Sequence, residues 1–156
     1  MQYRHEVKHE ISNLDMLILR QRLRAVMAPD SHAIDGQYEI RSLYFDNRDD
    51  KALREKLDGV SRREKYRIRM YNNDPSVIRL ERKFKCSGLG YKESALLTQA
   101  QACQIAGGDI HWMAASTDEV ILRFYTCLRN EGLAAKVIVD YTREPFVFVP
   151  GNVRVT

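Results

Sequence analysis

Two neighbouring stretches decide the fold of this chain: Arg63–Tyr71, REKYRIRMY, and Val77–Cys86, VIRLERKFKC. In both stretches apolar side chains alternate with charged ones, which is the period of a β-strand, where residues i and i+2 share a face. The residues between them, 72–75, read Asn-Asn-Asp-Pro and are typical of a turn. The sequence therefore predicts two strands here, each with one apolar face and one charged face.

The charged faces of these two strands carry more positive charge than a strand face in water usually does. They collect the following residues: Lys65, Arg67, Arg69, Arg79, Glu81, Lys83 and Lys85. Only Arg82 interrupts the apolar side. Like charges spaced this closely repel one another, so a bound anion would stabilise the face. The alternative is an ordinary sheet face exposed to water.

The rest of the chain alternates between predicted strands and helices, without a linker or a repeat. The further predicted strands are Tyr3–Ile11, Tyr38–Phe45, Tyr91–Ser94, Val137–Arg143, Phe146–Val149 and Val153–Thr156. Helices are predicted after the capping residues Ser12, Thr98 and Ser116, and over Arg48–Leu57. The last strand has no turn behind it, so it is either a short terminal strand or part of a longer protein.

Length and composition favour one domain that covers residues 1–156. The chain has a mass of 18.2 kDa and a net charge of +4, which by itself selects no partner. No apolar run is long enough to span a membrane, and no secretory signal is recognisable, so a cytoplasmic location is expected. The cysteines, Cys86, Cys103 and Cys127, lack the spacing of a disulfide framework or a zinc ribbon.

The arrangement of the charges favours a metal-bound triphosphate over nucleic acid as the anion. Carboxylates are interleaved with the cations, Glu6 beside Lys8 and Glu81 beside Lys83. Carboxylates can bind Mg²⁺ or Mn²⁺ while lysine and arginine bind the remaining phosphate oxygens, whereas a nucleic-acid groove gains nothing from carboxylates. Apart from Tyr71, no aromatic residue is placed to stack on a base. No glycine-rich phosphate loop is present, which predicts phosphate binding by side chains from several strands, as in a closed barrel lined with charge.

The segment His5–His9 matches the zinc-protease pattern H-E-x-x-H by letter only. That chemistry requires a helix, because both histidines must reach one metal ion. The segment alternates with the period of a strand, which separates the two histidines by roughly 13 Å. A zinc protease is therefore not the expected function.

Taken together, these motifs resemble the catalytic domain of the vacuolar transporter chaperone (VTC) polyphosphate polymerases, within the triphosphate tunnel metalloenzymes. The resemblance runs through these segments, in the family's order: Tyr3–Lys8, Ser42–Asn47, Tyr66–Tyr71, Leu80–Lys85, Tyr91–Ser94, Asp140–Arg143 and Val153–Thr156. It implies an α+β fold: an antiparallel β-barrel, or tunnel, with a charged interior and helices packed outside. The family continues to a later strand with a metal-binding Glu and a tunnel Lys, for which this sequence holds no match.

The resemblance also implies a function and a set of site residues. The implied reaction moves the γ-phosphate of ATP to a growing inorganic polyphosphate chain, with Mn²⁺ or Mg²⁺ as cofactor. By position, the family's phosphate-binding residues correspond to Lys8, Arg67, Arg69, Lys83, Lys92, Arg143 and Arg154, of which Lys8, Arg67 and Arg69 are the expected catalytic residues. The shared strand faces add Lys65 and Lys85. Glu6 and Glu81 are the candidate metal ligands, with ion pairing to a neighbouring lysine as their alternative role.

Two other functions stay open at the level of sequence. One is a triphosphatase of the same superfamily, which would use nearly the same residues on ATP or another triphosphate. The other is a module that binds polyphosphate without turning it over. Under any of these functions, changing both Arg67 and Arg69 to Ala is expected to abolish triphosphate binding and to leave the fold stable.

Overall fold

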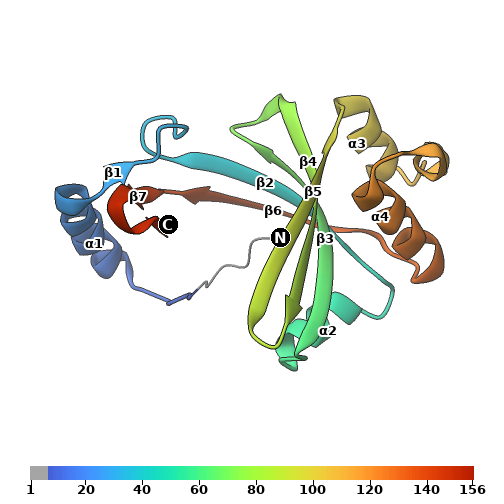
Figure 1. Cartoon of the computed structure of the whole chain (residues 1–156), viewed down its shortest axis with the longest axis horizontal. Coiled ribbons are helices and arrows are strands. Elements are labelled where there is room, and N and C mark those ends of the chain that lie inside the picture. Colours follow the sequence, from blue (N-terminus) through green and yellow to red (C-terminus); the bar gives the residue numbers. More distant parts are fainter. Residues whose placement is uncertain (1–6) are drawn as a thin grey trace. The chain divides into compact units, whose positions relative to one another are not determined.

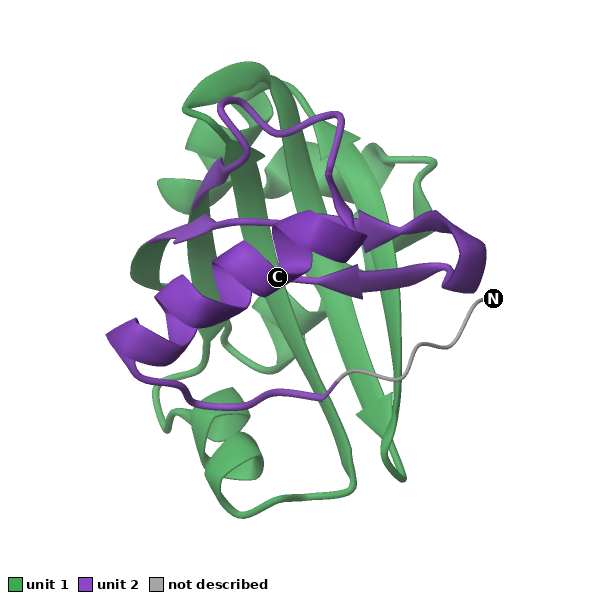
Figure 2. Ribbon diagram, turned by 90° about the vertical axis from the view of Figure 1, so that its left-hand side faces the viewer, with its two compact units in different colours: residues 1–5, 41–140 green, residues 6–40, 141–156 purple. Residues whose placement is uncertain are grey.

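A computed structural model describes residues 7–156 of the chain. Its helices are α1 (Asn13–Val26), α2 (Lys51–Leu57), α3 (Gln99–Ala106) and α4 (Glu119–Asn130), with short 3-10 helices at His111–Ala115 and Val149–Gly151. Its strands are β1 (Ala28–Pro29), β2 (Tyr38–Asp46), β3 (Arg62–Tyr71), β4 (Asp74–Cys86), β5 (Leu89–Leu97), β6 (Ala134–Arg143), β7 (Phe146–Phe148) and β8 (Val153–Val155). Figure 1 labels most of these elements, which confirm a mixed α+β architecture. The chain forms two compact units, coloured separately in Figure 2.

The first unit contains residues 41–140 and is built on an antiparallel sheet with the strand order β5-β4-β3-β2-β6. The β3–β4 hairpin turns at Asn72 and Asn73, which both have positive φ, 52° and 53°. A two-residue turn of this kind matches the twist of the flanking strands, and asparagine tolerates it well. The predicted strand pair is therefore confirmed, with β4 starting earlier than the pattern indicated.

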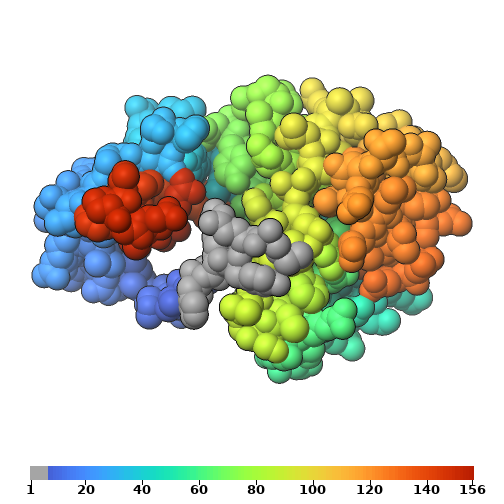
Figure 3. Space-filling model, in the orientation of Figure 1, coloured from blue at the N-terminus to red at the C-terminus, as the bar shows by residue number. Residues whose placement is uncertain are grey.

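The core of the first unit lies between the apolar face of this sheet and helices α3 and α4, whose surfaces adjoin in Figure 3 (yellow to orange). Phe124 of α4 is completely buried, and its ring stacks on Tyr66 of β3 with 4.8 Å between centroids. The ring of Phe45 meets the ring of Phe124 edge-on, with 4.9 Å between centroids. Arg82 lies on this side as well, where its buried guanidinium pairs with Glu64 and Glu93. Two carboxylates thus neutralise the one charge that interrupts the apolar pattern.

Truncating Ile121 to valine is expected to lower the free energy of unfolding by about 0.5–1.5 kcal/mol, because the residue is 5% exposed and belongs to this core. The matched control is Ile138→Val on β6, where the isoleucine is 60% exposed and the change should cost less than about 0.5 kcal/mol. Urea denaturation of both variants measures the difference. Equal losses at the two positions would contradict the assignment of the core.

The helix caps follow the sequence closely, with one correction. Ser12 and Thr98 each form the predicted capping box, with Asp15 and Gln101 respectively. The N-cap of α4, however, is Asp118 rather than Ser116, so that prediction is wrong. The carboxylate of Asp118 accepts hydrogen bonds from two backbone amides at the start of the helix, which a hydroxyl two residues earlier cannot reach.

The second unit contains the described residues 7–40 and 141–156, with helix α1 and a small antiparallel sheet in the order β1-β7-β8. The guanidinium of Arg20 on α1 forms an ion pair with Glu144, which ties the helix to the chain before β7. Asp30 is buried and accepts hydrogen bonds from the backbone and ring nitrogens of His32, each at 3.0 Å. Asp30 also pairs with Arg154 of β8.

One fold prediction is wrong over the residues that the structure describes, and another is not confirmed. Residues 7–11 of the predicted strand Tyr3–Ile11 have no regular secondary structure, and residues 3–6 lie outside the described part of the chain. Alternation alone does not make a strand, because a strand also needs a partner for its backbone hydrogen bonds. Within residues 7–156 the sheets do not close into a barrel, since β5 and β6 remain the two edges of the larger sheet. A closed tunnel is therefore not confirmed.

Candidate functional site

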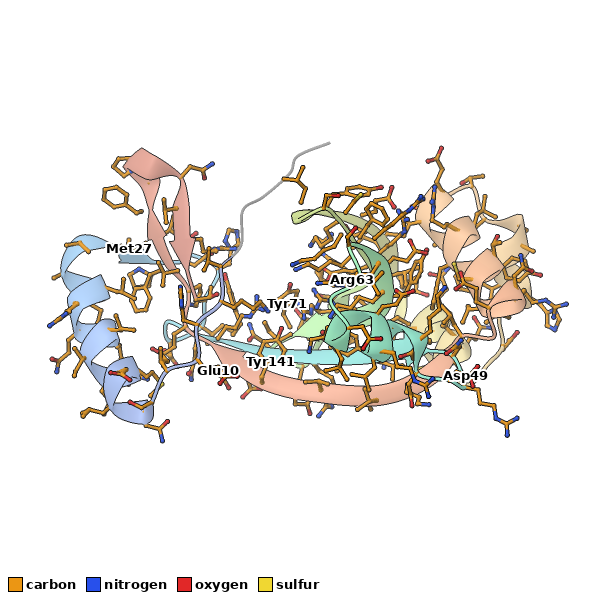
Figure 4. All side chains as sticks on the ribbon, turned by 90° about the horizontal axis from the view of Figure 1, so that it is seen from below. Glu10, Met27, Asp49, Arg63, Tyr71 and Tyr141 are labelled. Carbon is orange, nitrogen blue, oxygen red and sulfur yellow. The ribbon has the colours of Figure 1, made fainter. Side chains whose placement is uncertain are left out.

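Most charged residues of β3, β4 and β5 share one face of the sheet in the first unit, opposite the apolar core. We call this surface the charged face; with two β2 residues described below, it comprises Ser42, Tyr44, Lys65, Arg67, Arg69, Arg79, Glu81, Lys83, Lys85 and Lys92. Figure 4 labels Arg63 and Tyr71, which lie near the two ends of β3, the central strand of the face. Successive charged positions along each strand are roughly 6.5–7 Å apart.

The strand register arranges these side chains in three cross-strand rows. Lys65 lies opposite Lys83, and Lys83 lies opposite Lys92, so one row consists of three lysines. The next row pairs Arg67 with Glu81. The third places Arg69 opposite Arg79. Since neighbouring strands are only about 4.7–4.9 Å apart, two rows of like charge flank a single neutralised row. This concentration of positive charge favours binding of a multiply charged anion.

Glu81 neutralises the middle row and is almost completely buried, at 1% exposure. One of its carboxylate oxygens accepts from Nε of Arg67 at 2.8 Å and contacts Nη2 at 2.6 Å. The other accepts from Nζ of Lys92, also at 2.8 Å. Burial would raise the pKa of Glu81, but Arg67 and Lys92 outweigh it and hold the pKa below its ordinary value.

Strand β2 adds two polar residues to this face that no site prediction included. The hydroxyl of Tyr44 accepts a hydrogen bond from Nη1 of Arg67 at 3.0 Å, and Nζ of Lys65 lies 5.0 Å from the centroid of the tyrosine ring. The hydroxyl of Ser42 accepts from Nε of Arg69 at 2.9 Å. The signal was present in the sequence, because residues 42 and 44 alternate with the apolar positions 43 and 45.

Burial and charge together shift the protonation of the lysine end of the face. Burial, together with the nearby cations Arg67 and Lys83, lowers the pKa of Lys65 below its ordinary value. Burial alone would raise the pKa of Tyr44, but the adjacent Arg67 and Lys65 bring it below its ordinary value. The Tyr44 shift reflects the positive charge of the neighbouring arginine and lysine, whereas burial is the main cause of the Lys65 shift.

The predicted site residues divide between the two units. The charged face brings together Lys65, Arg67, Arg69, Lys83, Lys85, Lys92 and Glu81. Lys8, Arg143 and Arg154 belong to the second unit. There Lys8 is exposed in a segment without regular structure, Arg143 lies 5.1 Å from the ring centroid of Tyr141, and Arg154 pairs with Asp30. Glu6 lies outside the described residues.

Among residues 7–156, one single carboxylate and one group of three side chains are candidates for holding a metal ion. Glu81 offers the hard carboxylate oxygens that Mg²⁺ and Mn²⁺ prefer, although both oxygens are now engaged by cations. The group of three is Glu64, Cys127 and Glu131, whose ligand atoms lie within 4.8 Å of one another. Glu64 and Glu131 of this group line a pocket of about 290 Å³ in the first unit. Its thiol is a softer ligand than Mg²⁺ or Mn²⁺ requires, so the chemistry of Glu81 fits these ions better.

Acid should destabilise the protein partly through Glu81. Because its folded-state pKa lies below the ordinary value of 4.5, the ion pairs stabilise the fold above that pH and are lost as the pH falls through the folded pKa. We expect the stability of the wild type to fall below pH about 4.5 more steeply than that of Glu81→Gln. Urea denaturation of the wild type and of Glu81→Gln at several pH values between 3 and 7 measures this difference. Parallel profiles would contradict the ion-pair assignment.

The first unit is thus an α+β fold whose sheet presents a cation-rich face. In the comparison with family models, the VTC domain model matches residues 3–156. The chain therefore belongs to the VTC domain family. No curated protein matched the chain. Among the described residues, no helix is long and apolar enough to cross a membrane.

Proposed function

We propose that this chain is a polyphosphate polymerase-like phosphotransferase that moves the γ-phosphate of ATP to a growing inorganic polyphosphate chain. The single observation that carries the proposal is the row Lys65–Lys83–Lys92 beside the buried Arg67–Glu81 pair. Membership in the VTC domain family supports phosphotransfer in general. The substrates in this proposal are ATP or another triphosphate and polyphosphate, and nucleic acid is not among them.

In this mechanism the protein positions the phosphates and neutralises their charge, without a protein nucleophile. Transfer between phosphates proceeds through a transition state whose charge is spread over the non-bridging oxygens. Arg67 and Arg69 donate to these oxygens from fixed positions, and Lys65, Lys83, Lys85 and Lys92 hold the rest of the anion. We extend the same role to Lys8, Arg143 and Arg154 by their match to the family's motifs.

We propose Mn²⁺ or Mg²⁺ as the cofactor, held by Glu81 and Glu6. When bound, such a metal supplies charge neutralisation between phosphate oxygens. Glu81 must exchange at least one of its ion pairs to act as a ligand, because both of its oxygens accept from Arg67 or Lys92. That same observation favours a second candidate function, a module that binds polyphosphate without turnover and uses Glu81 only as an ion-pair partner.

Incubation of the protein with ATP and Mn²⁺ separates these functions. Long phosphate polymer on a gel supports the polymerase, and release of orthophosphate alone identifies a triphosphatase. Binding of inorganic tripolyphosphate without turnover, weakened by salt, identifies the binding module. Either of these last two outcomes contradicts the polymerase, and absence of both turnover and tripolyphosphate binding would overturn both proposed functions. Reactions without metal serve as the control, and reactions with Mg²⁺ show which of the two proposed metals supports turnover.

A further inference from the structure

The cations of β3 are long, flexible side chains, and what holds them in place decides how well they bind an anion. Arginine carries five N–H donors. In Arg67, Nε and Nη2 contact Glu81 and Nη1 donates to Tyr44. These contacts engage three donors and leave two for a ligand. Arg69 is 3% exposed, and the hydroxyl of Ser42, itself fully buried, accepts from its Nε.

Ser42 and Tyr44 come from the same strand and alternate along it, so β2 places one hydroxyl against each arginine of β3. Tyr44 also reaches the lysine row, since Nζ of Lys65 lies 5.0 Å from its ring centroid. A hydroxyl can accept from a cation without neutralising its charge, whereas a carboxylate neutralises it. The β2 hydroxyls therefore hold the two arginines in place without adding negative charge to the face.

We infer that β2 is the positioning strand of the anion site: Tyr44 and Ser42 hold Arg67 and Arg69 in a phosphate-binding geometry before the ligand arrives. This inference rests on the proposed function only in that the charged face binds phosphates. Neither residue needs to touch the substrate, since each acts through an arginine. A side chain fixed in advance loses less rotamer freedom on binding, so the hydroxyls increase affinity for the anion.

The test compares Tyr44→Phe with the wild type in binding inorganic tripolyphosphate by titration calorimetry. Phenylalanine keeps the ring beside Lys65 and removes only the oxygen that accepts from Arg67. We expect affinity to fall roughly 3- to 10-fold, the effect of one net hydrogen bond. The matched control is Tyr125→Phe on α4, away from the charged face, which should leave affinity unchanged. Ser42→Ala should lower affinity in the same direction as Tyr44→Phe.

A spectroscopic signature separates positioning from a merely structural role. The ionisation of Tyr44 is the tyrosinate absorbance of the wild type minus that of Tyr44→Phe, followed against pH. Neighbouring cations hold the pKa of Tyr44 below its ordinary value. Bound tripolyphosphate neutralises those cations and opposes the tyrosinate charge, so the difference titration should move to higher pH when the ligand is added.

The two failures are distinguishable. If the wild type does not bind tripolyphosphate, the proposed function is wrong. Suppose that the wild type binds it, that Tyr44→Phe binds equally well and that the difference titration does not move. The charged face then still binds the anion, and the positioning role of β2 is wrong. Reduced affinity in Tyr44→Phe together with the shift supports the inference.

Discussion

Replacing Arg67 and Arg69 together with glutamine is expected to weaken binding of inorganic tripolyphosphate at least about 100-fold. Each arginine supplies charge-assisted hydrogen bonds worth about 1.5–3 kcal/mol, so two arginines account for about 3–6 kcal/mol. Glutamine is preferred to alanine because Arg67 is a partner of the buried Glu81. An alanine at position 67 would leave the buried carboxylate of Glu81 without its arginine partner and so destabilise the fold. The structure therefore revises the expectation that the fold stays stable when both arginines become alanine.

Titration calorimetry at low salt measures this effect, with Arg41→Gln as the matched control. Arg41 lies on β2 of the same sheet, at a position that alternates with Ser42 and Tyr44, and its exposed side chain pairs with Asp140. The control should bind tripolyphosphate as the wild type does. Unchanged affinity in the double variant, or an equal loss in Arg41→Gln, would show that the charged face is not the anion site.

Glu81→Gln is expected to destabilise the fold by about 3–5 kcal/mol, the usual consequence of removing one member of a buried charge cluster. The variant leaves Arg67 and Lys92 without their shared carboxylate, next to Lys65 and Lys83. Added tripolyphosphate should restore much of the loss, because it supplies negative charge to the same cations. The variant's unfolding midpoint should therefore rise more with ligand than that of the wild type.

Urea denaturation with and without tripolyphosphate measures both parts of this prediction. The control is Glu131→Gln, which removes an exposed ion pair with Lys51 and should cost at most about 1 kcal/mol. Equal costs for the two variants would refute the central role of the Glu81 cluster. If Glu81→Gln loses the expected stability and added tripolyphosphate does not restore it, the ion pairs stabilise the fold but their cations do not bind the anion.

Much of the sheet could be predicted from the sequence because its alternation is strong. The period-two pattern of β3 and β4 places Lys65, Arg67 and Glu81 on one face, and the register confirms that they lie together. Capping boxes at Ser12 and Thr98 were equally readable, since each depends on residues three positions apart. Local signals of this kind survive folding when tertiary contacts agree with them.

The contacts between distant residues could not be predicted in the same way. Alternation places Glu81 on the charged face but does not say that both its oxygens meet cations, one of them Lys92 from another strand. Alternation also does not identify Tyr44 as a site residue, because its role depends on Arg67, which β3 places beside it. The predicted strand over Tyr3–Ile11 shows the converse error, because residues 7–11 alternate in sequence and yet have no regular secondary structure.

The central claim is that the charged face binds the phosphates. The most direct measurement is the change in backbone amide NMR shifts as inorganic tripolyphosphate is titrated into the protein. We predict that the largest shifts occur at Arg67 and Arg69 on β3 and at Glu81 and Lys83 on β4. Shifts confined to other parts of the chain, or no saturable shifts at all, would contradict the account.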